Sequence, residues 1–210
     1  MKPEDDADMP MPGPARSTAP ASSPVVLVLA SGRGERFAAS GGAAHKLRAL
    51  LHGQPLLEHT LAAVRASGLP WHVEDGGHPG MGDSIAAAVR ATAGAPGWLV
   101  LPGDLPLIRP DTLRSIASAL SGCAVAVPVH RQERGHPVGF AAQCLPGLQA
   151  LQGERGAASV LRQQAQQGRV RWVEVDDEGT VTDVDTVQDL ERAAQILRAR
   201  KGRGGGGGGY

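Results

Sequence analysis

The sequence has few cysteines and no excess of either charge, and both absences narrow the possible classes of protein. Cys123 and Cys144 are isolated, with no CxxC pair. This usage is typical of a reducing compartment and argues against structural zinc, so we expect two small buried apolar residues. The 21 Lys and Arg side chains balance the 21 Asp and Glu side chains. Such a balance gives no overall field to attract nucleic acid or an anionic membrane.

Long apolar runs are also missing. No segment approaches the ~20 apolar residues that span a bilayer, and the acidic start MKPEDDADM is unlike a secretory signal, so a cytoplasmic location is expected. Residues 1–23 are rich in Pro, Ala and Ser, and residues 201–210 are rich in Gly; both compositions predict disordered tails. Residues 24–200 remain as one predicted domain.

Several familiar catalytic motifs are absent as well. A dinucleotide-binding fingerprint would need a third glycine where Phe37 stands, and the Gly-Lys-Ser/Thr of a P-loop never occurs. The histidines lack HExxH or similar metal-binding spacing. Ser84, in GMGDS, could suggest a serine hydrolase, but no histidine follows His136. Helix capping or ligand contact is therefore the preferred interpretation of Ser84.

Apolar, strand-like segments alternate with helical periodicity along the chain, which predicts an α/β domain with helices on the faces of a sheet. The polar connection 130–137 between two of the strands favours one antiparallel strand. The stretch between Gly68 and Gly80 has room for one strand, so one crossover is missing on that side of the sheet. Strands are expected near residues 24–28, 71–74, 98–104, 124–129, 138–142, 170–175 and 181–186. Helices are expected from Pro55 to Gly68, after an N-cap at Asp83 or Ser84, from Pro110 or Asp111, between Gly156 and Gly168, and from Val187 to Arg200.

The segment LASGRGERF, residues 29–37, follows the first buried strand. Its place predicts a loop at the carboxyl edge of the sheet, where open α/β sheets bind their ligands. Glycines there let backbone N–H groups approach a phosphate, and arginines neutralise its charge. On this stretch alone, a glycine-rich turn with solvated arginines is an equally good interpretation.

Acidic and basic residues further along favour the ligand-binding interpretation. Asp104 ends another apolar strand, LVLPGD, and its carboxylate beside triphosphate oxygens could hold Mg²⁺; the alternative is a simple turn residue. Asp183 and Asp185, in TDVDT, could both face one metal ion from a strand, or one of them could cap the helix that follows. Lys46 is a candidate phosphate contact, and otherwise a solvated surface lysine.

Several motifs together resemble the molybdenum cofactor cytidylyltransferase family, within the MobA-like nucleotidyltransferases. The motifs occur in the same order as in the family. They are LASGRGERF with Lys46, PLLEHTLAAV, GMGDSIAAAV, LVLPGDLPLI, RGHPVGF, GERGAASVL and VTDVDTVQDL. The resemblance implies a Rossmann-like three-layer α/β/α sandwich whose sheet is mostly parallel with one antiparallel strand. It also implies transfer of CMP from CTP, or of another nucleoside monophosphate, to the terminal phosphate of the molybdopterin cofactor.

Site residues follow from the same resemblance. It places the nucleotide phosphates on Ala30, Ser31, Gly32, Arg33, Gly34, Arg36 and Lys46. It places the base and ribose near Gly80, Met81, Gly82 and Ser84, Mg²⁺ on Asp104 and Asp185, and the pterin against Arg134, Gly135, His136 and Pro137. A molybdoenzyme or its maturation chaperone is a further candidate partner.

Two features of the sequence bear on that implied function. Residues 29–32 read L-A-S-G, which favours the cytidylyl branch of the family, because the corresponding motif of the guanylyl branch resembles L-A-G-G. Residues 37–45, FAASGGAAH, separate Arg36 from Lys46 by more residues than the family usually has, and the lengthened loop 38–45 leads us to expect that Lys46 approaches the site differently. A transferase for another phosphorylated acceptor and a non-catalytic carrier of the cofactor are the alternatives, and a nicotinamide-dependent oxidoreductase is disfavoured.

Overall fold

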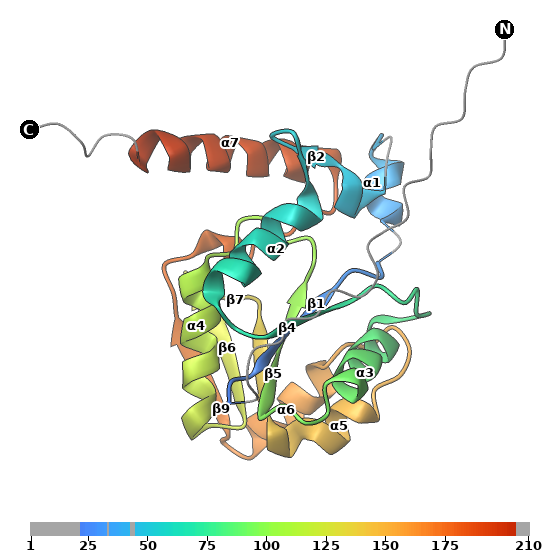
Figure 1. Cartoon of the computed structure of the whole chain (residues 1–210), viewed down its shortest axis with the longest axis vertical. Coiled ribbons are helices and arrows are strands. Elements are labelled where there is room, and N and C mark those ends of the chain that lie inside the picture. The colour runs from blue at the N-terminus through green and yellow to red at the C-terminus, as the bar shows by residue number, and fades with distance from the viewer. Residues whose placement is uncertain (1–21, 33, 43–44, 205–210) are drawn as a thin grey trace, which may run out of the picture.

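The computed structural model describes residues 22–32, 34–42 and 45–204, and side chains as far as residue 200. At its centre lies a seven-stranded sheet in the order β4-β1-β5-β8-β6-β7, with β9 paired to β6. Helices cover both faces of this sheet (Figure 1). The strands are β1 Val25–Leu29, β4 Trp71–Glu74, β5 Gly97–Pro102, β6 Val125–His130, β7 Glu133–Arg134, β8 Val138–Ala141 and β9 Val170–Glu174.

Five of the seven strands, β4, β1, β5, β6 and β9, run in the same direction. β1 lies between β4 and β5 and is parallel to both, and β9 is parallel to β6. β8 runs antiparallel to its neighbours β5 and β6, as the polar connection 130–137 predicts. That connection also contains the two-residue antiparallel strand β7, which the sequence did not predict. A separate hairpin joins β2, Leu50–Leu51, to β3, Gln54–Pro55.

Alternate side chains of the central strands divide between two hydrophobic cores, one on each face. Val26 and Val28 of β1 belong to the core beneath α2, α4 and α7, whereas Leu27 belongs to the core beneath α3, α5 and α6. β5 divides in the same way, with Leu99 on the first face and Trp98 on the second. Burial on both faces explains why these strands read as continuous apolar runs. The predicted three-layer α/β/α fold is confirmed.

The helices begin and end at residues that the sequence largely indicates. Gly68 ends α2 in the left-handed conformation, at φ 72°, and Pro110 opens α4 at its first position. The helices are α1 Glu35–Ala39, α2 Leu56–Ser67, α3 Met81–Ala91, α4 Pro110–Ala119, α5 Leu145–Gln149, α6 Ala158–Gln166 and α7 Val187–Gly204. Short 3-10 helices are η1 Lys46–Arg48, η2 Leu120–Gly122, η3 Ala142–Cys144 and η4 Glu178–Thr180.

Two predicted elements differ from the structure. Residues 181–186 form no strand, because their backbone bonds to a loop instead of a neighbouring strand: the Val184 N–H donates to the Asp104 carbonyl at 3.1 Å. Helix α3 begins at Met81 with Gly80 as N-cap, not at Asp83 or Ser84. The Asp83 carboxylate instead accepts a hydrogen bond from the Gly153 N–H at 2.8 Å, which ties the helix start to another loop.

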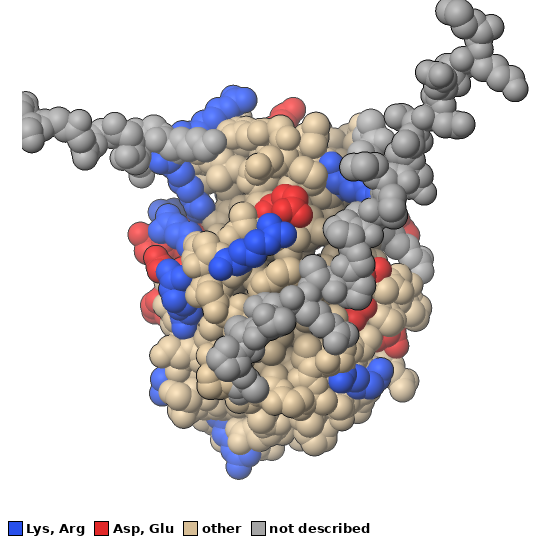
Figure 2. Space-filling view, in the orientation of Figure 1, with Lys and Arg blue, Asp and Glu red and all other residues tan. Residues whose placement is uncertain are grey.

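Three further expectations concern the sheet edge, the tails and the surface. As predicted, a single strand, β4, lies between Gly68 and Gly80, and it forms the edge of the sheet beside β1. Most of the predicted tails, residues 1–21 and 205–210, lies outside the described residues. No helix within the described ranges has the length and apolar character to cross a membrane. Charged side chains of both signs are scattered among uncharged residues on the face shown in Figure 2.

Candidate active site

The carboxyl ends of β4, β1 and β5 lie side by side and carry the loops that form the site. The Ala30 N–H donates to the Glu74 carbonyl at 2.8 Å, and the Gly103 N–H donates to the Leu29 carbonyl at 2.9 Å. These bonds fasten the start of the glycine-rich loop to its neighbours on both sides. As predicted, the loop and Asp104 therefore lie at the same edge of the sheet.

A cavity of about 780 Å³ opens at this edge. Residues from the glycine-rich loop, the start of α3, the loop after β5 and the segment before α7 line it together. Among the predicted site residues, the cavity is lined by Ser31, Gly32, Gly34, Arg36, Lys46, Gly80, Met81, Ser84, Asp104, Arg134, His136 and Asp185. Ala30, Gly82, Gly135 and Pro137 are not part of the lining, and Arg33 lies outside the described residues.

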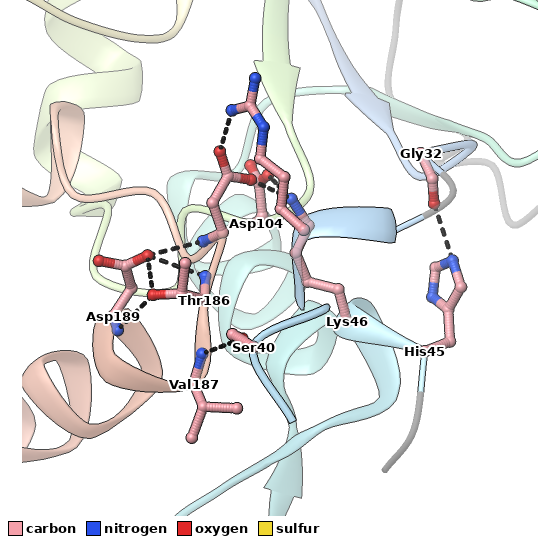
Figure 3. A network of polar contacts seen from close by, with 10 residues as sticks. Gly32, Ser40, His45, Lys46, Asp104, Thr186, Val187 and Asp189 are labelled. Atoms are coloured by element: carbon pink, nitrogen blue, oxygen red, sulfur yellow. Dashed lines mark hydrogen bonds and ion pairs between the residues drawn. The ribbon is translucent and has the colours of Figure 1, made fainter. Parts of the chain in front are cut away.

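Lys46 is at the centre of the polar network in Figure 3. Its Nζ donates to Asp104 Oδ2 and to Asp185 Oδ1, both at 2.7 Å. Burial would lower the pKa of Lys46, but the charge of Asp104 and the hydrogen bonds to both carboxylates outweigh it and raise the pKa above its usual value. Lys46 is therefore a charged, largely buried ammonium and not a solvated surface lysine.

Asp185 has a second cationic partner. Arg36 Nη1 lies 3.0 Å from Asp185 Oδ2, although the Arg36 side chain is 81% exposed. The hydrogen bond from Lys46 is the main reason that the pKa of Asp185 falls below its usual value, and Arg36 adds to the effect. Asp185 is therefore an ionised carboxylate near neutral pH.

The two interpretations of the acidic pair before α7 can now be separated. Thr186 and Asp189 cap the helix reciprocally: the Thr186 N–H donates to Asp189 Oδ2 at 2.8 Å, and the Asp189 N–H donates to Thr186 Oγ1 at 3.2 Å. Asp183 and Asp185 are thus left to face the cavity. Burial raises the pKa of Asp183, and the nearby charges of Asp104 and Asp185 contribute in the same direction.

The glycine-rich loop is held close to Lys46. Gly34 has φ 67°, and a Cβ added there would lie 3.1 Å from the Lys46 Cβ, so the turn into α1 requires glycine. His45 Nε2 and the Gly32 carbonyl are 2.7 Å apart, which fastens the far end of the long connection back onto the loop. Lys46 thus reaches the site despite the extra residues before it, of which 43 and 44 lie outside the described ranges.

The start of α3 combines a cavity wall with a tight packing contact. Ser84 Oγ lies 2.7 Å from Ser31 Oγ and donates to the Gly80 carbonyl at 3.1 Å. A Cβ at Gly80 would lie 2.2 Å from the Gly153 carbonyl carbon, and one at Gly82 would lie 2.7 Å from the Arg155 carbonyl oxygen. Gly82 therefore serves the packing of the 152–155 loop, while Gly80 and Ser84 also face the cavity.

The residues expected to face the acceptor divide in a similar way. Arg134 lines the cavity, and its guanidinium lies 4.4 Å from the centroid of the Trp172 ring. The His136 imidazole also lines the cavity; its Nδ1 is buried and has no hydrogen-bond partner within the described ranges, and burial lowers the pKa of His136. Gly135 instead packs against Thr180, whose carbonyl would lie 2.5 Å from an added Cβ.

Other lining residues had no role predicted from the sequence. His78 follows the parallel strand β4, so the rule that ligands bind beyond strand carboxyl ends could have found it. Glu154 reaches the cavity because the 152–155 loop packs on Gly80 and Gly82, and no sequence pattern signals that contact. Glu133 lies on β7, the short strand that the sequence did not predict.

The donors present fit a divalent cation that is shared with a bound ligand. Asp104 Oδ1 is buried and has no hydrogen-bond partner among the described residues. Within the described ranges, no group of three or more His, Cys, Asp or Glu side chains is arranged to hold a metal ion by itself. Mg²⁺ is usually bound by one or two carboxylates together with substrate phosphates, and Asp104 and Asp185 can supply such a pair.

Fold and site together define an α/β protein with a ligand cavity at the carboxyl edge of its sheet. Residues 62–169, about half of the chain, match the family described as the MobA-like NTP transferase domain. The chain belongs to this family. Purine catabolism protein PucB of Bacillus subtilis is 30% identical over 128 residues, which are 60% of this chain and 62% of PucB. The chain spans less than two thirds of the length of this curated relative.

Solved structures share the fold. Rv0371c of Mycobacterium tuberculosis H37Rv has a TM-score of 0.66 and 24% identity, over 83% of this chain and 99% of Rv0371c. The nucleotidyl transferase Mth528 of Methanothermobacter thermautotrophicus has a TM-score of 0.70 and 21% identity, over 85% and 99%. Molybdopterin-guanine dinucleotide biosynthesis protein A of Archaeoglobus fulgidus has a TM-score of 0.60 and 22% identity, over 83% and 99%. These similarities support the Rossmann-like architecture.

Proposed function

We propose that this protein is a Mg²⁺-dependent nucleotidyltransferase that transfers CMP from CTP to the terminal phosphate of the molybdopterin cofactor. One observation carries the proposal: the glycine-rich loop, Lys46 and Asp104 meet at a single cavity of about 780 Å³. Membership of the MobA-like NTP transferase domain family supports the reaction class. The acceptor rests on the resemblance of the RGHPVGF segment, residues 134–140, to the cofactor transferases.

In this reaction an oxygen of the acceptor phosphate attacks the α-phosphorus of CTP, and the bond from that phosphorus to the bridging oxygen breaks as pyrophosphate leaves. No protein nucleophile is needed. The chain's own part is to place both phosphates and to offset their charge. Among the described residues of the glycine-rich loop and its surroundings, Lys46 and Arg36 are cations in position to do so, and the backbone N–H groups near Gly32 and Gly34 supply neutral donors.

The charge of the cavity supports the proposed role of a metal ion. Six acidic and three basic described residues line it. Because a triphosphate adds further negative charge, a cation in addition to the three basic residues of the described lining would favour its binding. When bound to Asp104 and Asp185, Mg²⁺ would offset the charge that develops on the α-phosphate and on pyrophosphate. The acidic residues are Glu35, Asp104, Glu133, Glu154, Asp183 and Asp185, and the basic ones are Arg36, Lys46 and Arg134.

The choice of CTP rests on Ser31. The guanylyl branch that the sequence resembles less closely has glycine at this position, whereas here a hydroxyl bonds to Ser84 across the cavity wall. A side chain at this position narrows the space beside Gly80 and Ser84, which favours the smaller pyrimidine base. Arg134, supported by the Trp172 ring, and the neutral His136 are the proposed contacts of the pterin.

The test is pyrophosphate release from CTP, GTP and ATP, each with Mg²⁺ and the molybdopterin acceptor. We expect release with CTP to exceed release with GTP and ATP by at least about tenfold. Faster release with GTP would show that the nucleotide substrate is GTP and not CTP. Turnover with a different phosphorylated acceptor but not with molybdopterin would reassign the acceptor. Binding of the cofactor without any turnover would support a carrier.

A glycine substitution tests whether the loop approaches the triphosphate. A Cβ added at Gly32 would meet no atom of the described residues within 4 Å, so Gly32→Ala should leave the thermal midpoint unchanged. If a phosphate lies against this backbone, the added methyl group should raise the KM for CTP about tenfold or more. Steady-state kinetics and thermal denaturation measure the two effects. The control is Gly94→Ala, because Gly94 has no positive φ and a Cβ there would meet no atom of the described residues within 4 Å. Gly53 in the β2–β3 turn is unsuitable, because its φ of 83° would strain an alanine.

A further inference from the structure

We propose that Lys46 is an internal counter-ion that a divalent metal ion must displace, so that metal and nucleoside triphosphate bind as a coupled pair. The inference rests on the proposed function for the identity of the second ligand. It assigns Lys46 a role in the free protein that is separate from phosphate binding.

The position of the ammonium carries the argument. Lys46 Nζ lies 2.7 Å from one oxygen of Asp104 and 2.7 Å from one oxygen of Asp185, and its side chain is only 12% exposed. The two carboxylates are 17% and 30% exposed. At such partly buried positions an unpaired charge is costly, so the single ammonium stabilises both acids. A cation thus already lies between the two carboxylates that fit Mg²⁺.

A metal ion that bound alone would compete with Lys46 for these oxygens. Within the described part of the chain, the hydrogen bonds of the Lys46 ammonium go to Asp104 and Asp185 alone. Displacement by a metal alone would leave the ammonium in a largely buried place without an acceptor. A triphosphate removes this cost because its oxygens can accept the displaced ammonium. Metal and triphosphate should therefore each raise the affinity of the protein for the other.

Arg36 provides a matched comparison. It also contacts Asp185, at 3.0 Å, but its side chain is 81% exposed and no hydrogen bond to Asp104 joins it to the second carboxylate. Water can replace Asp185 as its partner at little cost. Loss of Arg36 removes the same unit of charge from the site without freeing both acids. If only the loss of positive charge mattered, the two substitutions would change the metal affinity equally. The counter-ion role predicts that loss of Lys46 raises the metal affinity far more than loss of Arg36.

The experiment measures Mn²⁺ affinity in the absence of nucleotide, by calorimetry, for the wild-type protein, Lys46→Met and Arg36→Met. We expect Lys46→Met to bind Mn²⁺ at least about tenfold more tightly than wild type, and Arg36→Met to differ by less than about threefold. Circular dichroism establishes that each variant is folded. Equal or weaker Mn²⁺ binding by folded Lys46→Met would overturn the proposal, as would an equal gain in both variants.

A second measurement uses the unmodified protein, in case Lys46→Met does not fold. The chain has three lysines, Lys2, Lys46 and Lys201, so selective ¹³C labelling gives few signals to resolve. We expect the Lys46 ¹³Cε resonance to stay in place with millimolar Mg²⁺ alone and to move when CTP is added with Mg²⁺. Full movement with Mg²⁺ alone would contradict the coupling. Failure of CTP and Mg²⁺ to bind at all, by calorimetry, would instead refute the proposed function.

Discussion

Asp104→Ala is expected to reduce pyrophosphate release at least about 100-fold while the protein stays folded. The substitution removes a carboxylate whose buried Oδ1 has no partner in the described part of the chain and whose Oδ2 accepts a hydrogen bond from Lys46. Both the proposed metal ligand and the placement of the neighbouring ammonium are lost together. A coupled assay for pyrophosphate, at saturating CTP and acceptor, measures the effect.

A matched control for this variant is Asp111→Ala. Asp111 is in the first turn of α4, its side chain is 85% exposed, and it is not part of the cavity lining. Its loss should leave turnover within about twofold of wild type. Undiminished turnover of Asp104→Ala would show that Asp104 has no role in the reaction. Loss of the folded protein's circular dichroism spectrum in this variant would show that the role of Asp104 is structural.

Asp177→Ala is expected to be the most destabilising of the substitutions considered, by about 3 kcal/mol. The Asp177 carboxylate is buried and accepts hydrogen bonds from the Arg109 N–H at 2.9 Å, Thr112 Oγ1 at 2.7 Å and the Gly179 N–H at 3.0 Å. Removal leaves these buried donors without an acceptor. For a domain of this size the thermal midpoint should fall by about 8 °C.

The neighbouring residue gives the control for Asp177. Asp176 is exposed, and in the described structure it contributes its carbonyl to Arg109 Nη1 while no hydrogen bond involves its carboxylate. Asp176→Ala should therefore shift the thermal midpoint by about 1 °C or less. Similar midpoints for the two variants would show that the Asp177 hydrogen bonds do not fix the turn that leads to Asp183 and Asp185.

The sheet and half of the site could be predicted because they depend on local signals. Apolar runs marked the buried strands, and Asp104 and the glycine-rich loop follow parallel strands whose ends meet at one edge. The antiparallel β8 was indicated by the short polar connection before it. Each of these inferences needed only composition, burial and the geometry of a sheet.

The remaining features depend on contacts between distant segments. Lys46 and Asp185 are 139 residues apart, and their contact depends on how the 181–186 segment crosses the sheet edge. That segment was predicted as a strand, yet Asp177 fixes the turn before it and Val184 bonds to the Asp104 loop. Glu154 likewise enters the cavity through packing on two glycines. Sequence patterns carry no signal for such tertiary contacts.

The most direct test of the account is a crystal structure of the protein with Mg²⁺ and a non-hydrolysable analogue of CTP. The account predicts that the triphosphate lies against residues 31–34, that a metal ion binds Asp104, and that Lys46 has moved from the two aspartates to a phosphate oxygen. A nucleotide bound outside this cavity, or a triphosphate with no metal at Asp104, would contradict it.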